Sequence, residues 1–339
     1  MLIDASQEID ISKLRPQNDF EHQVVLFLED CFSAAPTVKV QTSGSTGTPK
    51  IFEVEKEKMK YSAQQTCRFL GLNKGDTALL CLPVAYISGK MMVVRALEQG
   101  LKLKVVPPSV QPLKNLNITV DFCAMTPLQV EHSLAELHQI RKLIIGGAAV
   151  SETLNDKILD LKIPHQKVYE TYGMSETLSH IALREISPQK AQYFKALDGV
   201  QLFQDERGCL GINAPKLNED QLITNDLVAF GSPQEFYFLG RVDSIINSGG
   251  AKIFPEQLEA LAKRTIDREL VFIGVKDEVL GEKLIVVVEG EETPEIKTQI
   301  ENLAYEKSFH RPKAVVFMPK IPRTPNGKVS RLELKKCLE

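Results

Sequence analysis

The chain has 339 residues, and at roughly 150 residues per domain this length predicts about two domains. Hydrophobic residues make up 43% of it and charged residues 25%, so the composition is that of a globular protein and excludes a disordered one. Lys and Arg number 41 against 44 Asp and Glu, a formal net charge of -3, and no segment gathers enough basic residues for a nucleic-acid partner. No apolar run approaches the ~20 residues of a bilayer span, and the N-terminus has no apolar signal core, so we expect no membrane insertion.

Cysteine and histidine usage bears on compartment and metal chemistry. The six cysteines lie far apart without a CxxC pair, several of them inside apolar segments, where a reduced thiol behaves as a small hydrophobe. We therefore expect a reducing, cytoplasmic setting. The histidines form no HExxH or HxH pattern, which argues against a metal site built from nitrogen and sulfur ligands.

The first half of the chain alternates between helical periods and short apolar runs. A strand at Thr37–Gln41 leads into a loop of Thr, Ser and Gly. Such alternation predicts βα units and a mainly parallel sheet. In chain order we expect helix Glu55–Leu70, run Thr77–Leu82, helix Ile87–Glu98, runs Lys102–Val106 and Ile118–Ala124, helix Leu128–Gln139, run Lys142–Ile145, helix Ser151–Asp160 and run Lys167–Glu170.

The second half changes character twice. Residues 190–240 carry Gly, Pro and short alternating segments, which predict a small antiparallel β-subdomain. After Gly240 a compact set of about 100 residues predicts a small domain of its own. Its elements are expected at helix Pro255–Thr265, strands Leu270–Val275 and Lys283–Glu289, helix Pro294–Ser308 and strand Lys313–Met318.

The fold class expected from this pattern is α/β. A large N-terminal domain, residues 1–240, would have a mainly parallel sheet flanked by helices plus the β-subdomain. A small α+β domain, residues 241–339, would follow, with the boundary near Arg241 to Ser244.

The strongest local motif is the segment from Thr42 to Lys50, TSGSTGTPK. Its glycines let backbone amides point at an anion, its hydroxyls add donors and its lysine adds charge, which suits a polyphosphate. The spacing does not match the Walker A pattern, and the chain has neither a GxSxG elbow nor a GxGxxG turn after a strand. A flexible surface turn is the alternative interpretation of this segment.

Three further residues suit a nucleotide site, and each has a plainer interpretation. Glu176, among the hydroxyls of Thr171 to Thr177, could hold Mg²⁺ or could be a helix N-terminal charge. Asp226 could accept from ribose hydroxyls or could belong to an Asn-Asp turn. Lys328 stands in a proline-rich loop and could equally be a solvated surface charge.

The order of these motifs resembles the adenylate-forming superfamily of acyl-CoA synthetases, luciferases and peptide-synthetase adenylation domains. In that resemblance Thr42 to Lys50 is similar to the phosphate loop, Gly146 to Ala149 to the adenine-contacting turn, and Tyr172 to Thr177 to the aromatic-Gly-x-Thr/Ser-Glu motif. Asp226 is similar to the ribose acid, Gly240-Arg241-x-Asp243 to the hinge, Ser248-Gly249-Gly250 to the motif after it, and Lys328 to the C-terminal catalytic lysine.

Within the superfamily the chain most resembles the 2-succinylbenzoate-CoA ligases of menaquinone biosynthesis. The resemblance rests on Leu82 to Gly89 with Arg95, Ala124 to Gln129, and Ile246 to Gly250. Three features depart from the pattern. Only 41 residues precede the phosphate loop, which suggests a shortened N-terminal region; Tyr86 stands where His is usual; and Asn225 replaces a Gly, which a left-handed turn would tolerate.

The resemblance implies formation of an acyl-adenylate from a carboxylic acid and ATP, followed by transfer of the acyl group to CoA. A mobile C-terminal domain would turn about Asp243 between the two steps. The implied catalytic residues are Lys328, Glu176 and Arg241, with Glu176 also the Mg²⁺ ligand; the ATP site would use Thr42, Ser43, Gly44, Ser45, Thr46, Gly47, Lys50, Gly147, Ala148, Thr171, Tyr172 and Asp226; the acid would meet Tyr86, Lys90, Arg95, Ser175 and His180; and CoA would pass Gly249 and Gly250.

An aromatic dicarboxylate leaves one carboxylate unreacted, and burying it without a partner would be costly. Lys90, Arg95 and His180 are the candidate partners, and each could instead be a surface or helix-end charge. Two other interpretations stay open: an adenylating enzyme for a different aryl, fatty or amino acid, and a non-catalytic nucleotide-binding relative. We also expect that the chain could form homo-oligomers.

Overall fold

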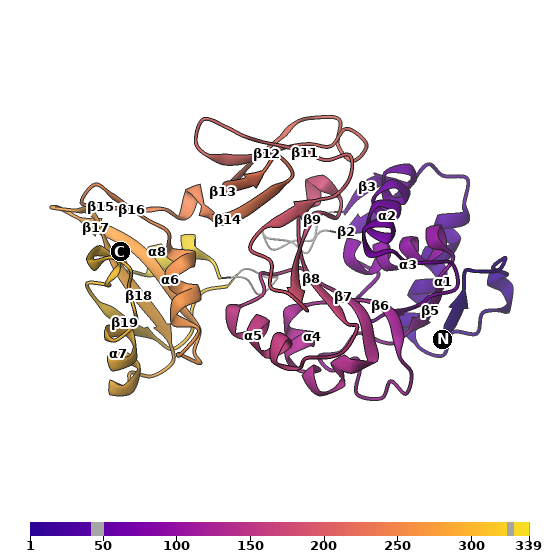
Figure 1. Cartoon of the computed structure of the whole chain (residues 1–339), viewed down its shortest axis with the longest axis horizontal. Coiled ribbons are helices and arrows are strands. Elements are labelled where there is room, and N and C mark those ends of the chain that lie inside the picture. The colour runs from indigo at the N-terminus through magenta and orange to yellow at the C-terminus, as the bar shows by residue number, and fades with distance from the viewer. Residues whose placement is uncertain (42–50, 324–328, 339) are drawn as a thin grey trace.

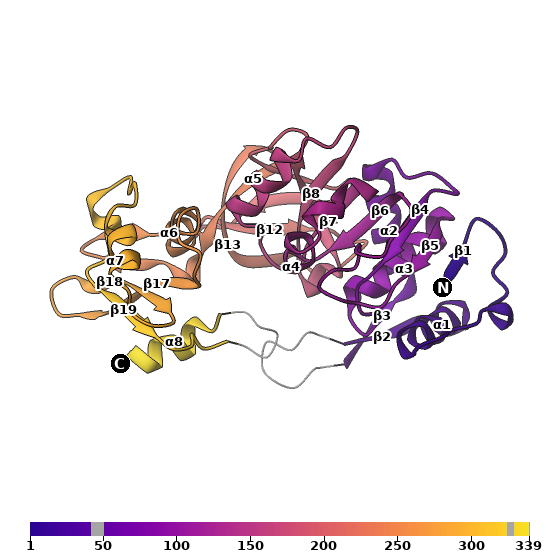
Figure 2. The ribbon, with the colours of Figure 1, turned by 90° about the horizontal axis from the view of Figure 1, so that it is seen from below.

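The computed structural model describes residues 1–41, 51–323 and 329–338, and in these ranges the chain forms two domains, each with its own β-sheet (Figure 1). The sheet of the large domain has 12 strands and that of the small domain has five. Figure 2 shows the two domains following one another along the long axis of the molecule. Along the chain, the large sheet ends with strand β14 (Glu235–Arg241), and the small sheet begins with strand β15 (Ile246–Ser248). The expected α/β fold class is confirmed.

One half of the large sheet is parallel. Its five parallel strands run in the order β5-β4-β6-β7-β8, and β1 (Leu2–Asp4) joins antiparallel at the edge. Both faces of the central strands β4 and β6 are covered, which is why they are nearly continuous apolar runs, whereas β5 alternates Lys with buried Leu103 and Val105. Leu79 and Leu80, adjacent in β4, enter two different buried clusters, one on each face. The parallel strands are β4 (Thr77–Leu80), β5 (Lys102–Val105), β6 (Val120–Met125), β7 (Ile140–Ile145) and β8 (Lys167–Gly173).

Helices cover the two faces of this half. On one face lie α1 (Asp19–Phe32), α2 (Lys56–Leu70) and α3 (Ile87–Gln99), whose apolar sides share one buried cluster. On the other face lie α4 (Pro127–Glu131), a 3-10 helix at Leu134–Gln139 and α5 (Glu152–Asp160). The prediction of a single helix over Leu128–Gln139 is wrong. The helix ends because His132 and Ser133, poor helix formers, separate its two parts and Ser133 has non-helical φ and ψ.

The other half of the large sheet is antiparallel and includes the predicted β-subdomain. Strand β9 (His180–Ser187) pairs antiparallel with β8 and carries the sheet onward. The order then continues β10-β14-β13-β12-β11, so the subdomain extends the same sheet edge to edge. Its remaining strands are β10 (Phe194–Ala196), β11 (Gln201–Gln204), β12 (Cys209–Asn213) and β13 (Leu222–Ser232). A separate hairpin pairs β2 (Thr37–Gln41) with β3 (Ile51–Glu55).

The small domain packs helices on a short sheet. A long hairpin, β17 (Leu270–Asp277) and β18 (Gly281–Glu289), forms its centre, and Phe272 and Val286 are among its fully buried side chains. Helix α7 ends at Glu301, seven residues before the expected end. The other elements are β16 (Ala251–Ile253), β19 (Val315–Met318), α6 (Pro255–Ala262), α7 (Pro294–Glu301) and α8 (Arg331–Leu338).

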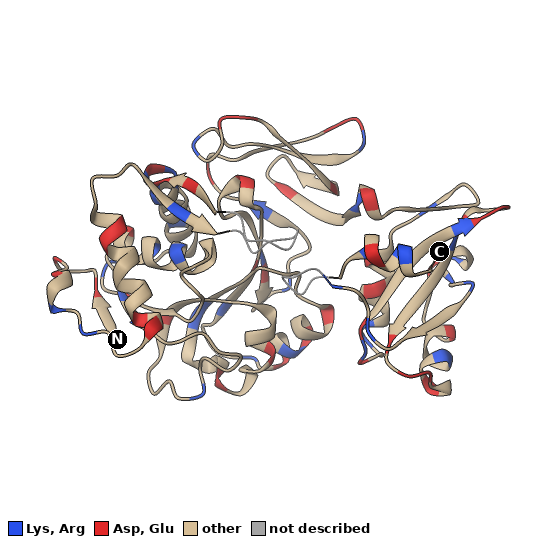
Figure 3. Cartoon of the chain, turned by 180° about the vertical axis from the view of Figure 1, so that it is seen from behind, with Lys and Arg blue, Asp and Glu red and all other residues tan. Residues whose placement is uncertain are grey.

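The distribution of surface charge is relevant to nucleic-acid partners, and the length and apolar content of the helices are relevant to membrane insertion. Lys and Arg are interspersed with Asp and Glu over both domains (Figure 3). Among the described residues, no helix combines the length and apolar content that crossing a bilayer requires.

Candidate active site

The candidate site lies where the parallel and antiparallel halves of the large sheet meet, at the carboxyl ends of β7 and β8. Ligands of open α/β sheets bind at such an edge. The turn after β7 approaches β8 closely, because the Thr171 hydroxyl donates to the carbonyl of Ile145 at 3.1 Å. A β-carbon on Gly146 would lie 2.4 Å from that hydroxyl oxygen, and Gly147 has φ +86°, so this turn depends on its two glycines. Ala148 follows on the surface.

The end of β8 contacts the acid that the sequence singles out for ribose binding. The Tyr172 phenol donates to Asp226 Oδ2 at 2.5 Å, and burial together with this carboxylate raises the pKa of Tyr172. Opposite Asp226 in the sheet stands Arg241, which donates to Asp226 Oδ1 at 3.3 Å. The carboxylate side chain is 14% exposed and keeps lone pairs free beyond these two bonds. Tyr172, Asp226 and Arg241, predicted separately, therefore form one cluster.

The cluster continues to the predicted hinge. Arg241 Nε and Nη2 donate to the two carboxylate oxygens of Asp243 at 3.0 and 2.8 Å. These bonds lower the pKa of Asp243. Arg241 thus links an acid of the last large-domain hairpin to an acid of the connection between the domains.

Asn225 and Asp226 do not form the turn that the sequence suggested. Both lie within β13, and Asn225 is not among the residues with positive φ. The interpretation of Asn225 as a left-handed turn residue is wrong. Its side chain accepts instead from Arg207 at 3.2 Å, while the backbone N–H of Asp226 donates to the Thr224 hydroxyl at 3.0 Å.

Glu176 stands in a short turn after β8. The segment Ser175–Thr177 is a single 3-10 turn, so the alternative of a charge at the start of an α-helix is not supported. Both Ser175 and Glu176 are exposed, and no described residue bonds the Glu176 carboxylate. Asn218 donates to the Glu176 carbonyl at 3.1 Å and holds the turn against the loop before β13.

Two of the three cationic candidates for the acid lie together. Arg95, on α3, is 2% exposed; its Nη2 donates to the Ser179 hydroxyl at 3.1 Å and its Nη1 contacts Met92 Sδ at 3.8 Å. His180, at the start of β9, is 7% exposed and its Nε2 lies 3.0 Å from Thr66 Oγ1. Burial lowers the pKa of Arg95 to about 10, and burial and the Arg95 charge together lower that of His180 well below its usual value.

The third candidate points elsewhere. The Lys90 ammonium lies 3.9 Å from the centre of the Phe27 ring of α1, and burial lowers its pKa. Lys90 and Arg95 are both buried, so the alternative of a surface charge is wrong for both. Tyr86, 36% exposed, precedes α3 and forms a backbone bridge with Gln41.

The predicted CoA residues occupy a hairpin turn of the small domain. Gly249 and Gly250, with φ +56° and +82°, join β15 to β16, and two positive φ angles are what a two-residue hairpin turn needs. In Figure 1 this hairpin lies away from β8 and β9. The structure therefore does not bring these glycines to the nucleotide cluster in this orientation.

Several predicted residues lie outside the described part of the chain. They are Thr42, Ser43, Gly44, Ser45, Thr46, Gly47, Lys50 and Lys328. Their described neighbours are paired: Gln41 stands opposite Ile51 in the β2–β3 hairpin, and Arg323 forms a bridge with Val329.

Sequence reasoning did not single out two residues that contact His180 and Arg95, namely Thr66 and Ser179. Thr66 is one hydroxyl on the buried side of an amphipathic helix, and such residues usually bond their own helix. Ser179 lies two residues after Thr177, where the Glu176 motif ends, and this proximity is a signal that could have identified it.

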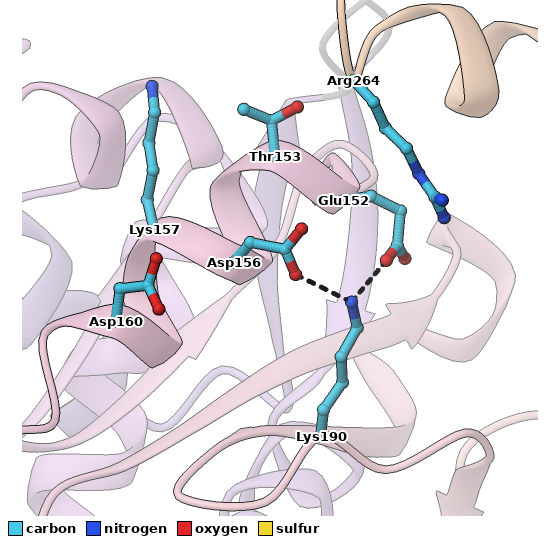
Figure 4. Close-up of a pocket in the computed structure, with 7 residues that line it drawn as sticks. All are labelled: Glu152, Thr153, Asp156, Lys157, Asp160, Lys190 and Arg264. Carbon is cyan, nitrogen blue, oxygen red and sulfur yellow. Dashed lines mark hydrogen bonds and ion pairs between the residues drawn. The ribbon is translucent and has the colours of Figure 1, made fainter. Parts of the chain in front are cut away.

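One set of contacts between the domains lies apart from the site, whereas Gln257 of α6 donates to the Leu239 carbonyl of β14, close to Arg241. The Thr153 hydroxyl of α5 donates to the carbonyl of Lys263, at the end of α6, at 3.0 Å. Beside it is a cavity of about 400 Å³ in which Lys190 bridges Glu152 and Asp156, and Arg264 reaches in from the small domain (Figure 4). These polar contacts join the far end of α6 to the large domain in the observed orientation.

Known proteins resemble this chain over most of its length. A family model described as AMP-binding enzyme matches residues 35–202. A 2-succinylbenzoate–CoA ligase of Lactococcus lactis subsp. lactis (strain IL1403) is 25% identical over 323 residues, which cover 88% of this chain and 70% of the relative. The solved structure of an acyl-CoA synthetase (AMP-forming)/AMP-acid ligase II-like protein from Dyadobacter fermentans DSM 18053 is 32% identical, covers 97% of each chain and has a TM-score of 0.66.

A further solved structure agrees in fold. An O-succinylbenzoate coenzyme A synthetase from Bacillus subtilis, in complex with ATP and magnesium ion, has a TM-score of 0.74 over 88% of this chain and 69% of its own. Its sequence is 22% identical, so the likeness concerns the fold.

Proposed function

Because the chain belongs to the family of AMP-binding enzymes, we propose that it is an ATP-dependent acid–thiol ligase acting on 2-succinylbenzoate. The carboxylate attacks the α-phosphorus of ATP, forming the acyl-adenylate and releasing pyrophosphate. The thiol of CoA then attacks the acyl carbon, and AMP leaves with the electron pair of the broken bond. The name of the Lactococcus relative supports this acid as substrate.

We base the choice of a dicarboxylic acid on the burial of Arg95 and on its lack of an anionic partner among the described residues. A buried guanidinium is costly unless an anion pairs with it, and no carboxylate of the described residues does so. Its Nε has no hydrogen-bond partner among those residues, and one of its two bonds is to a weak thioether acceptor. A substrate with a second, unreacted carboxylate supplies the missing anion.

The nucleotide would bind along the edge described above. Gly147, Ala148 and Thr171 would contact the adenine, and Tyr172 orients Asp226 to accept from the ribose hydroxyls. Glu176 fits Mg²⁺, because its exposed carboxylate bonds nothing in the described chain and this ion takes one or two carboxylates and completes its shell with water and phosphate oxygens. When bound, the ion would neutralise charge on the triphosphate.

The two steps require different surroundings, so we propose that residues 1–240 and 241–339 are domains that rotate about Asp243. In one orientation Lys328 would stabilise the charge that develops during adenylation. In the other, the small side chains at Gly249 and Gly250 would leave room for the thiol-bearing arm of CoA. The Arg241–Asp243 pair crosses this connection and would change partners as the domain turns.

All six cysteines are free, which suits a reducing compartment, and we place the reaction in the cytoplasm. The proposal is tested by ATP-dependent pyrophosphate release with a panel of acids. 2-Succinylbenzoate should give the highest kcat/KM, above its two monocarboxylate analogues, fatty acids and amino acids. A higher kcat/KM for a fatty or amino acid would show that the enzyme acts on that acid and not on 2-succinylbenzoate. No pyrophosphate release with any acid would show that the protein binds nucleotide without catalysing this reaction.

A further inference from the structure

A buried ion pair stands beside the turn that follows β7. Glu170 of β8 and Arg184 of β9 are directly opposite each other in the sheet, and Arg184 Nη2 donates to Glu170 Oε2 at 2.5 Å. Their side chains are 7% and 15% exposed. The guanidinium also lies 5.0 Å from the centre of the Phe194 ring. An apolar pair is often as stable as a buried ion pair, so stability alone does not explain why these charges are buried.

The second oxygen of Glu170 holds the backbone of the turn. The Val150 N–H donates to Glu170 Oε1 at 2.9 Å. Val150 is buried, whereas the three residues before it, 147–149, are exposed. A carboxylate that accepts from a backbone N–H and from an arginine makes charge-assisted bonds, which are stronger than bonds between neutral groups. Glu170 therefore fixes the point at which the chain leaves the exposed part of the turn.

The turn is anchored at its other end as well. The Gly146 N–H donates to the carbonyl of Met125, at the end of β6, at 3.1 Å. Thr171, the neighbour of Glu170 on β8, donates its hydroxyl proton to the last carbonyl of β7 at 3.1 Å. Residues 147–149 lie between these anchors, and they include the two residues of the turn that would contact the adenine.

We propose that Glu170 is a positioning residue for the adenine of ATP and acts through this turn, without touching the nucleotide. The inference rests on the proposed function and deepens it. Arg184 supplies the countercharge that lets a carboxylate occupy this buried place. Without the bond to Val150, the turn keeps its anchored start and loses its fixed end, so the base binds less tightly. The phosphates and the acid, which other residues bind, are held as before.

The test is the double variant Glu170→Leu/Arg184→Met, which removes the acceptor together with the charge that would otherwise be left unpaired. Its Kd for AMP, measured by isothermal titration calorimetry, should rise about threefold to tenfold, as expected for the loss of one net hydrogen bond. The KM for ATP should rise by the same factor. The KM for the acid and the inhibition constant of inorganic pyrophosphate should stay within about twofold of the wild type, because their sites are separate from the turn. Arg184→Lys, which keeps the carboxylate and a countercharge, should retain the wild-type Kd for AMP.

A similar pair at the opposite edge of the sheet supplies the matched control. Asp121, at the start of β6, accepts from the Thr77 N–H at 2.8 Å and from Arg141 Nη1 at 3.1 Å, so it too joins a backbone N–H to an arginine. The double variant Asp121→Leu/Arg141→Met should leave the Kd for AMP unchanged.

Should Glu170→Leu/Arg184→Met fold poorly by circular dichroism, Glu170→Gln takes its place. Its single amide oxygen cannot serve both donors, so the Kd for AMP should again rise while the pyrophosphate constant stays. An unchanged Kd for AMP, or an equal change in the AMP and pyrophosphate constants, would overturn the inference while the proposed function stands. A wild-type protein that binds AMP but releases no pyrophosphate with any acid would contradict the proposed function alone, and one that binds no AMP would contradict both.

Discussion

Replacing Arg95 by methionine should stabilise the protein without substrate and weaken binding of the dicarboxylate. Burial lowers the pKa of Arg95 to about 10, so the charged form is disfavoured in the folded state at every pH below that value. At about 1.4 kcal/mol per pKa unit the cost is about 3 kcal/mol. It declines only as the pH rises above 10, where the folded state begins to lose the proton.

The bond from Arg95 to Ser179 offsets part of this cost. A hydrogen bond to a charged group contributes about 1.5–3 kcal/mol, and methionine fills the same space next to Met92 without it. We expect Arg95→Met to raise the free energy of unfolding by about 1 kcal/mol, measured by urea denaturation. The KM for 2-succinylbenzoate should rise about 10-fold to 100-fold while that for ATP stays near its wild-type value.

Ligand-dependent stability supplies a second readout. At 100 times its Kd the dicarboxylate should stabilise the wild type by about 2.7 kcal/mol and the variant hardly at all at the same concentration. Arg184→Met is the matched control, since Arg184 pairs with the buried Glu170 at 2.5 Å and its removal should cost about 3–5 kcal/mol. Lower stability of substrate-free Arg95→Met, or equal rises in both KM values, would refute the reasoning.

Three further variants test the nucleotide site and the catalytic lysine. Tyr172→Phe should lower the free energy of unfolding by about 1.5–3 kcal/mol and raise the KM for ATP severalfold, because Asp226 loses a charge-assisted bond; an unchanged ATP KM would separate Asp226 from the ribose. Glu176→Gln should fold normally and lose most magnesium-dependent adenylation, whereas an unaltered magnesium titration would remove Glu176 from the site. Lys328→Ala should slow adenylation by about 10²–10³, yet form thioester normally from prepared acyl-adenylate and CoA; an equal fall in both assays would contradict a lysine that serves one step.

The parallel half of the fold could be predicted because its central strands β4 and β6 are buried on both faces and leave nearly continuous apolar runs, while β5 alternates Lys with buried Leu103 and Val105. Helix α1 was missed although its signals are present: Asn18 caps it, and Val24, Phe27 and Leu28 have helical spacing. Strand β9 could not be predicted because its buried residues His180–Leu183 are followed directly by Arg184 and Glu185, so it shows neither alternation nor a long apolar run.

For the candidate site, too, sequence reasoning identified single residues but not the contacts between them. Motif order identified Asp226, Arg241 and Asp243 one by one, but their contact depends on the register of β13 against β14, which no local pattern encodes. Thr66 and His180 are 114 residues apart, and their bond exists because α2 packs on the start of β9. The Asn225 interpretation was wrong because Asn225 lies inside β13, where an irregularity in the pairing with β12 between Ile223 and Leu227 takes the place of a turn.

The most direct test of the central claim is to incubate the purified chain with ATP, Mg²⁺, CoA and 2-succinylbenzoate and to follow all products by chromatography. We predict equimolar AMP, pyrophosphate and 2-succinylbenzoyl-CoA, with no thioester when ATP, CoA or the acid is omitted. Release of ADP and phosphate in place of AMP and pyrophosphate, or consumption of ATP without thioester while another acid supports it, would contradict the account.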